Sequence, residues 1–162
     1  MKLKSILDYE GLYSLDLDNN QVYSHRSKKY LKITTRRDGY NIVSLLNNKK
    51  YKIIYLHRLV YEIHNGYIPT TMFIDHIDLK KNNNNINNLR LATNSQNQMN
   101  RRVGSNNKLG IKNIKLTNCK TYQVTIANNK QVYNKNFKTL EEAIENRNIQ
   151  LKKYHGQYAN LD

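Results

Sequence analysis

Residues 74–102 read IDHIDLKKNNNNINNLRLATNSQNQMNRR, and the expected fold follows from this stretch. The run TMFIDHI leads into it and predicts a short strand that ends at an Asp-His pair. The asparagine-rich segment that follows has no apolar period, so we expect a long loop. Ser95 and Gln98 then have the spacing of a capping box, which predicts the start of a helix. The expected order is strand, long loop and helix.

The Asp-His pair and the asparagines carry groups that suit phosphodiester hydrolysis. That reaction needs a water nucleophile, a base that accepts its proton, and a cation that stabilises the growing charge. Asp75 offers a carboxylate, and an asparagine carbonyl is a second oxygen ligand for Mg²⁺. The imidazole of His76 suits a base near neutral pH. Asparagine fills 26 of the 162 positions, so two asparagines at a given spacing can match a nuclease motif by chance. The assignment of an active site here therefore depends on the flanking residues.

The chain is strongly basic. Its 27 Lys and Arg residues exceed 12 Asp and Glu, which gives a net charge of +15 and a pI near 9.8. Phosphates are the commonest strong counter-charge for such an excess, so we expect a nucleic-acid partner. An anionic membrane surface is the alternative, but no amphipathic Lys/Arg helix with a continuous apolar face stands out. The single cysteine, Cys119, excludes an internal disulfide and a four-cysteine zinc site, so no structural zinc is expected.

Neither a signal peptide nor a membrane span is predicted. The N-terminal MKLKSILDYEGLYS lacks a long apolar core and a small-residue cleavage site. No apolar run approaches transmembrane length. We therefore expect an intracellular protein that lies with its nucleic-acid partner, in the cytoplasm, nucleoid or nucleus, and is not secreted or attached to a membrane.

The residues before residue 57 predict short strands, and a helix follows them. GLYSL, QVYSH and GYNIVSLL alternate loosely between apolar and polar residues, and polar turns separate them. The run YKIIYL at residues 51–56 is predicted as a buried strand. In HRLVYEIHNG, the side chains of Leu59, Val60 and Ile63 share one helical face, and the final Asn-Gly predicts the end of the helix.

The C-terminal third predicts a three-strand meander followed by one helix. Residues 104–109 are polar and predict a linker. GIKNIKL, TYQVTIA and QVYNKNF then read as strands, joined by the turns TNCK and NNK. Thr139 and Glu142 form a second capping box, and the apolar stripe behind it predicts a helix to about Tyr154.

Four stretches form one pattern: DHI on a strand, NNLRLAT, SQNQMNR on a helix, and the upstream LHRLVYEI. Together they resemble the HNH nuclease family of phage and intron-type endonucleases, which has the ββα-metal fold. By this resemblance Asp75 and Asn97 would bind a divalent metal, Mg²⁺ first and Mn²⁺ as the alternative, and His76 would be the general base. Asn88 would hold the loop and thereby orient the His76 ring. The spacings of 12 residues from His76 to Asn88 and 9 from Asn88 to Asn97 are ones the family uses.

The resemblance also has one departure and leaves several residues without a catalytic role. Leu79 stands where the family usually has glycine, so the turn after the Asp-His pair is where a difference is expected. Asn82–Asn85 and Asn87 are interpreted as solvated loop. His57, at a helix start, is interpreted as structural in preference to DNA-binding.

The segments on either side resemble modules that accompany such nucleases. The first 50 residues, with DYEGLYSL, QVYSH and DGYNIVSLL, are similar to a small nuclease-associated module. The last segment, with GIKNIKL, YQVTI, NFKTLEEAIENRN and KKYHGQYANL, resembles the DNA-binding domain of plant Apetala-type and ethylene-response transcription factors, whose sheet enters the major groove. The polar side chains predicted to contact DNA are Arg58, Arg90, Arg101, Arg102, Lys115, Gln123 and Thr125.

The sequence therefore predicts an α+β chain with a ββα-metal core. The predicted parts are a strand-rich module at residues 1–50, the HNH nuclease at 51–103, the linker at 104–109 and the DNA-binding domain at 110–162. We expect a monomeric, metal-dependent endonuclease acting on double-stranded DNA. Two alternatives remain open, a DNA-binding regulator with an inactive nuclease core and a basic protein associated with RNA or the ribosome.

Overall fold

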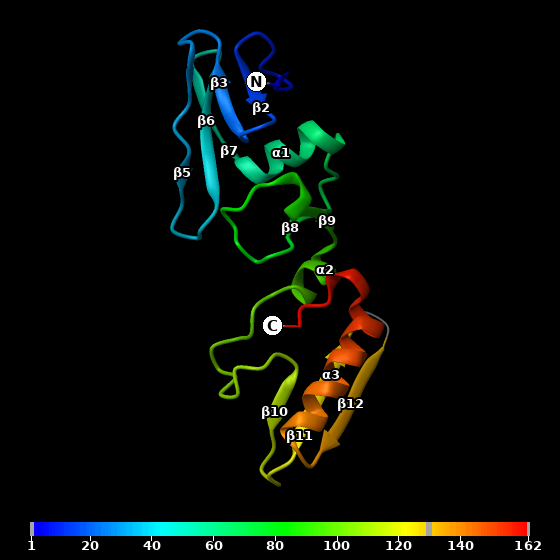
Figure 1. Cartoon of the computed structure of the whole chain (residues 1–162). Coiled ribbons are helices and arrows are strands. Elements are labelled where there is room, and N and C mark those ends of the chain that lie inside the picture. Colours follow the sequence, from blue (N-terminus) through cyan, green and yellow to red (C-terminus); the bar gives the residue numbers. More distant parts are fainter. Residues whose placement is uncertain (1, 129–130, 162) are drawn as a thin grey trace. The chain divides into compact units, whose positions relative to one another are not determined.

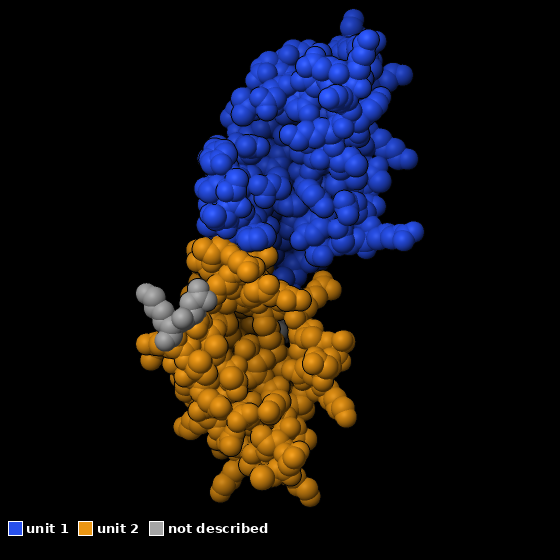
Figure 2. Space-filling model, turned by 180° about the vertical axis from the view of Figure 1, so that it is seen from behind, with its two compact units in different colours: residues 1–92 blue, residues 93–162 orange. Residues whose placement is uncertain are grey.

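The computed structural model describes residues 2–128 and 131–161, and these form several small sheets with few helices (Figure 1). The chain divides into two compact units, Met1–Ala92 and Thr93–Asp162 (Figure 2). In this division residues 1–50 lie in the same unit as residues 51–92, and the predicted domain boundaries remain a prediction. No helix in the described ranges is long and apolar enough to cross a membrane.

Two antiparallel sheets build the first part of the first unit. Their cores are the fully buried Leu15, Val22, Val43 and Leu45. The hairpin of Asn41–Asn47 and Lys50–Tyr55 turns at Asn48-Lys49 with both residues at positive φ, as a tight two-residue hairpin loop requires. The four-stranded sheet has the order β1 (Leu3–Ser5), β2 (Tyr13–Asp16), β3 (Gln21–Ser24), β4 (Lys29–Tyr30). The three-stranded sheet has the order β5 (Thr34–Thr35), β6 (Asn41–Asn47), β7 (Lys50–Tyr55).

The prediction that residues 51–56 form a buried strand is wrong in its burial. The strand is present as β7, but Tyr51 and Ile53 are 74% and 59% exposed. The physical reason is the alternation along the strand: Ile54 lies opposite the buried Val43 and packs against the core, whereas Ile53 lies opposite the exposed Ser44 on the outer face. Apolar residues in a run therefore indicated a strand here without indicating burial.

The helix α1 (Leu56–Asn65) follows β7 directly and packs on the same core. Its buried side chains include Leu59, Val60 and Ile63, as the 3.6-residue period predicted. Gly66 ends the helix at φ +88°, which confirms the predicted stop.

A two-stranded antiparallel ladder closes the first unit. It consists of β8 (Phe73–His76) and β9 (Leu89–Ala92), with the short helix η1 (Ile86–Asn88) just before β9. The register pairs Asp75 with Arg90 and His76 with Leu89. The asparagine-rich loop therefore begins and ends at the same point of the ladder.

The second unit begins with α2 (Asn94–Met99) and continues into a sheet covered by a long helix. Its core contains Val124 and Ile126 from the sheet and Ala143 and Leu151 from the helix, all fully buried. The elements are β10 (Ile114–Leu116), β11 (Tyr122–Ala127), β12 (Val132–Phe137), α3 (Leu140–His155) and η2 (Gly156–Tyr158) (Figure 1). Part of the predicted turn NNK, residues 129–130, lies outside the described residues.

The two predicted capping boxes have different outcomes. Thr139 and Glu142 cap α3 reciprocally, as predicted. The cap predicted at Ser95 is wrong, because α2 starts two residues earlier with Thr93 as N-cap and Gln96 as its partner. Thr93 follows directly on the last residue of β9, so the chain enters the helix at the first competent cap it reaches.

Candidate active site

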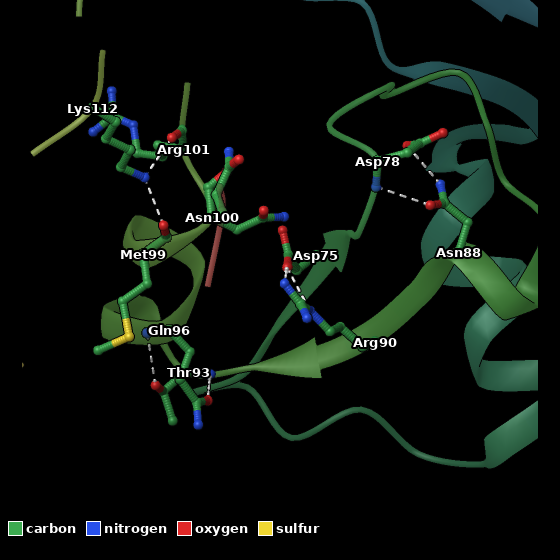
Figure 3. A network of polar contacts seen from close by, with 11 residues as sticks. Asp75, Asp78, Asn88, Arg90, Thr93, Gln96, Met99, Asn100, Arg101 and Lys112 are labelled. Atoms are coloured by element: carbon green, nitrogen blue, oxygen red, sulfur yellow. Dashed lines mark hydrogen bonds and ion pairs between the residues drawn. The ribbon is translucent and has the colours of Figure 1, made fainter. Parts of the chain in front are cut away.

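Asp75 and Arg90 form a close ion pair across the β8–β9 ladder (Figure 3). The guanidinium donates from Nε and Nη2 to Oδ2 of Asp75 at 2.8 and 2.7 Å. Asp75 is 4% exposed, and a carboxylate buried to that degree needs a counter-charge. Arg90 supplies that charge, and the carboxylate it binds, Asp75, is the one predicted to bind a metal. Its role as a DNA contact remains a prediction.

His76 is buried at the end of β8 and points a ring nitrogen at the loop. Its Nε2 lies 3.2 Å from Oδ1 of Asn84. Burial lowers the pKa of His76, while the Asn84 hydrogen bond and the nearby Asp78 and Asp75 oppose that shift. A lowered pKa favours the neutral imidazole, which is the form that accepts a proton.

His57 lies beside His76, with 5.1 Å between the ring centroids. It also packs against Tyr40 and Tyr55, at 5.0 and 5.5 Å between centroids. Burial, with a smaller contribution from His76, lowers the pKa of His57 to about 3. These aromatic contacts agree with the interpretation of His57 as a structural residue.

Asn88 ties both ends of the asparagine-rich loop together. Its Oδ1 accepts from the backbone N–H of Asp78 at 3.0 Å, and its Nδ2 donates to Oδ1 of Asp78 at 2.9 Å (Figure 3). The same Nδ2 donates to the backbone carbonyl of Asn83 at 2.8 Å. These are the contacts of a residue that closes the loop, and none of them reaches the ring of His76 directly.

The turn after the Asp-His pair keeps a glycine-type conformation despite Leu79. Leu79 has φ +60°, and its backbone N–H donates to the carbonyl of His76 at 3.0 Å. A side chain in this left-handed region is strained. The absence of the usual glycine therefore does not abolish the turn but makes it costlier to form.

The interpretation of Asn82–Asn85 and Asn87 as solvated loop is wrong for one residue. Asn84 is 6% exposed, while the other four are exposed. Its amide is enclosed by the loop and contacts the ring of His76. The sequence gives no signal that separates Asn84 from its neighbours, because the distinction arises only when Asn88 and Asp78 close the loop.

The remaining predicted site residues lie on several elements. Asn97 is in α2, and its assignment as a metal ligand remains a prediction. Lys115 and Gln123 are directly opposite in the β10–β11 ladder, and Thr125 lies on the same face, away from the buried Val124. Arg58 is half-buried in α1, while Arg101 and Arg102 are exposed after α2.

The C-terminal end of α2 is held by two residues that the sequence did not single out. Nζ of Lys112 donates to the carbonyls of Met99, at 2.6 Å, and Arg101 (Figure 3). Nδ2 of Asn160 donates to the carbonyl of Asn100 at 3.3 Å. Carbonyls at a helix end lack partners within the helix, so these side chains satisfy them.

The donor atoms of this site suit a hard divalent cation. Within residues 2–128 and 131–161 there is no cluster of three His, Cys, Asp or Glu side chains that could hold a metal. A carboxylate with amide oxygens, completed by water and phosphate, is an oxygen-only shell of the kind Mg²⁺ accepts. The residue types present fit that ion.

Comparison with known proteins gives one consistent family. The model of the HNH endonuclease family matches residues 54–99. The uncharacterized HNH endonuclease L560 of Acanthamoeba polyphaga mimivirus is 38% identical over 106 residues, which cover 64% of this chain and 54% of that protein. DNA endonuclease I-HmuI of Bacillus phage SP01 is 41% identical over 106 residues, which cover 62% and 59%. The chain thus spans little more than half the length of these relatives.

A solved structure gives broader coverage. It comes from work on DNA binding and cleavage by the HNH homing endonuclease I-HmuI. The match has a TM-score of 0.56 at 30% identity and covers 96% of this chain and 91% of that chain. The similarity therefore extends well beyond the Asp-His segment, over the sheets and helices of both units.

Proposed function

The chain belongs to the HNH endonuclease family, and we propose from that premise that it is a metal-dependent DNA endonuclease of the homing type. The observation that carries this proposal is the coincidence of the family match, residues 54–99, with a folded Asp-His site at the end of β8. The site contains a carboxylate, an imidazole and a loop closed by Asn88. The net charge of +15 suits double-stranded DNA as the partner.

The proposed roles come from the HNH resemblance, and the contacts of His76 and Asn88 support two of them. His76 is the general base, supported by the burial that favours its neutral form. Asp75 and Asn97 hold the divalent metal, Mg²⁺ first and Mn²⁺ as the alternative. The metal, when bound, stabilises the charge on the phosphate and the leaving oxygen. Asn88 keeps the loop closed around His76.

The finer architecture is also part of the proposal. β8, β9 and α2 follow one another as strand, strand and helix, the order of a ββα-metal unit. The three-stranded sheet with α3 is proposed as an Apetala-type DNA-binding domain, with Lys115, Gln123 and Thr125 on its outer face. We propose that the protein acts as a monomer on DNA inside the host cell, without membrane attachment.

A second candidate, a DNA-binding regulator with an inactive core, has one specific observation in its favour. Oδ2 of Asp75 already accepts two hydrogen bonds from Arg90. A metal at Asp75 has to share or displace this guanidinium, since both cations bind the same carboxylate. If Arg90 holds Asp75 permanently, the protein binds DNA without cutting it.

Incubation with supercoiled plasmid separates the two candidates. We expect nicking or cutting that requires Mg²⁺ or Mn²⁺, and a loss of about 10² to 10⁴ in rate for His76→Ala, the usual contribution of a positioned base. His64→Ala is the matched control, because His64 is an exposed histidine at the end of α1. Tight plasmid binding with no cleavage under any divalent metal would instead identify the regulator.

A further inference from the structure

The turn between β5 and β6, residues 36–40, contacts the asparagine-rich loop that follows the Asp-His pair (Figure 1). Two backbone hydrogen bonds of 2.9 Å close this turn. Nζ of Lys81, in the loop, donates to the backbone carbonyl of Asp38 at 2.9 Å. Beside it, Nδ2 of Asn41 donates to the carbonyl of Asn82 at 3.5 Å. A side chain of the loop is therefore held by a residue that lies 43 positions earlier in the sequence.

The ammonium group of Lys81 also lies over the ring of Tyr40, with 4.6 Å between Nζ and the ring centroid. A cation within about 6 Å of an aromatic face is attracted by it. A free lysine side chain loses conformational entropy when it binds a ligand, and a side chain that is already held in place loses less. Tyr40 and the carbonyl of Asp38 therefore order an ammonium group that remains exposed.

The charge of Lys81 is available to an anion. Within residues 2–128 and 131–161, its contacts are with neutral groups, the carbonyl of Asp38 and the ring of Tyr40. An ammonium has three N–H donors, and the bond to Asp38 uses one of them. The neighbouring Arg36 differs, because its Nε lies 3.3 Å from Oδ2 of Asp38 and that carboxylate offsets its charge. Lys81 rather than Arg36 is therefore the cation here that suits an anionic ligand.

Tyr40 also places this ammonium close to the proposed base. The ring of Tyr40 lies 5.9 Å from the ring of His76 and 5.0 Å from that of His57, measured between centroids. Lys81 and His76 are therefore neighbours of one aromatic ring. Phosphates follow one another about every 3.4 Å of helix axis along each DNA strand. A strand that has its scissile phosphate at His76 thus brings further phosphates to Lys81 within a few nucleotides.

We propose that Lys81 binds a backbone phosphate close to the scissile one, and that Tyr40 is the positioning residue that holds its ammonium there. This inference rests on the proposed function, since it takes His76 as the point where DNA is cut. The ligand is the phosphodiester backbone, so the contact fixes the register of the strand and carries no base preference. It is a contact beyond those that the sequence predicted.

Binding measured without any divalent metal tests the contact independently of cleavage. Lys81→Met keeps the apolar stem and removes the charge, so we expect weaker binding to a DNA duplex and a slope of log affinity against log salt that is flatter by about 0.9. Lys81→Arg should restore the slope. Lys80→Met is the matched control, an exposed lysine of the same loop, and should leave the slope nearly unchanged. Equal flattening in both methionine variants, with circular dichroism showing both folded, would overturn the proposal.

A double-mutant cycle tests the positioning role of Tyr40. Tyr40→Leu removes the aromatic face and should weaken metal-free binding, whereas Tyr40→Phe keeps the face and should bind as the wild type does. In the Lys81→Met background, Tyr40→Leu should cause no further loss, because its effect passes through the ammonium. The same loss in both backgrounds would show that Tyr40 does not act through Lys81. If Lys81→Met does not fold, equal binding by the Leu and Phe variants would refute the role of the ring.

Ethylation interference locates the phosphate on a duplex that contains the cleavage position. Blocking one phosphate within a few nucleotides of the cut should weaken binding by the wild type but not by Lys81→Met. A phosphate a full helical turn away, about 10 base pairs, would contradict its placement beside His76. If the wild type binds DNA but cuts none, the proposed function fails, while the metal-free titrations still decide whether Lys81 holds a phosphate.

Discussion

Leu79 lies in the turn that follows His76, and its backbone has a conformation that favours glycine. At φ +60° a side chain costs roughly 1–2 kcal/mol relative to glycine. The backbone hydrogen bond from Leu79 to the carbonyl of His76 keeps the turn in place despite that cost. This strain can be measured separately from the packing of the leucine side chain.

The comparison of Leu79→Gly with Leu79→Ala isolates the strain. Both variants lose the half-buried leucine side chain, but only glycine relieves the positive φ. We expect the glycine variant to be about 1 kcal/mol more stable than the alanine variant in urea unfolding, the relief of strain exceeding the entropy cost of glycine. Equal stability of the two variants would show that the turn is unstrained.

The burial of His57 makes the stability of the protein depend on pH. Its folded pKa is about 3, below the ordinary value of 6.5, because the ring is buried among Tyr40, Tyr55 and His76. As the pH falls below 6.5, His57 becomes protonated in the unfolded chain, whereas in the folded chain it stays neutral until about pH 3. Stability is therefore lost on acidification in this window, by about 2 kcal/mol between pH 7 and 5.

His57→Phe tests this assignment, because phenylalanine keeps an aromatic ring among the same neighbours and does not titrate. Urea unfolding at pH 7, 6 and 5 should show a shallower decline in the variant than in the wild type. The decline should not vanish, since burial lowers the pKa of His76 in the same direction. Identical slopes in the two proteins would contradict a neutral, buried His57.

At single residues, the sequence predicts what residue type and spacing encode. Asp75 and His76 stand out because hydrolysis of a phosphodiester needs a metal ligand and a base, and Asn88 stands out through the spacing and flanking residues of the HNH resemblance. Asn84 does not stand out, because 26 asparagines give it no distinct signal and its burial depends on contacts made by Asp78 and Asn88. The pairing of Arg90 with Asp75 likewise depends on the β8–β9 register.

At the scale of elements, α2 shows how a short helix depends on its ends. Six residues are too few for a helix to be stable alone, so capping and packing must maintain it. Thr93 and Gln96 cap the N-terminal end, and Lys112 and Asn160 bind carbonyls at the C-terminal end. The sequence contains two overlapping capping boxes, Thr93 with Gln96 and Ser95 with Gln98. The first is used because β9 ends at the residue just before Thr93.

Lys112→Met should therefore destabilise α2. The methionine keeps the apolar stem but removes both hydrogen bonds to the helix end, which should cost about 1–3 kcal/mol. Amide hydrogen exchange should become faster in residues 94–101 in particular. Lys108→Met is the control, an exposed lysine that should leave exchange in α2 unchanged. Similar exchange rates in both variants would mean that Lys112 does not hold the helix.

At the scale of the whole chain, the helix that carries Asn97 belongs to the same compact unit as the C-terminal sheet. The sequence suggested a break at residues 104–109, because that segment is polar and rich in Gly, Ser and Asn. The side chains of Lys112 and Asn160 reach back across this segment to the end of α2. Such long-range contacts have no local pattern, which is why composition alone did not predict them.

Removal of residues 104–162 would therefore confuse two effects, since it deletes the proposed DNA-binding face together with the groups that hold α2. Substitutions on the outer face of the sheet avoid this. The triple variant Lys115→Gln, Gln123→Ala, Thr125→Ala keeps the buried Val124 and Ile126 and leaves Lys112 and Asn160 in place. It tests the face of the sheet without disturbing the helix.

We expect this triple variant to bind double-stranded DNA more weakly and to cut saturating DNA at the wild-type rate, because none of the three residues belongs to the Asp-His site. Loss of one phosphate contact at Lys115 should flatten the slope of log affinity against log salt by about 0.9. Lys153→Gln removes the same single charge from an exposed position on α3 and is the matched control. The measurement is a set of DNA-binding titrations at several salt concentrations. If the control weakens binding and flattens the slope as much as the triple variant does, the sheet contributes only general positive charge and makes no specific contact with the DNA.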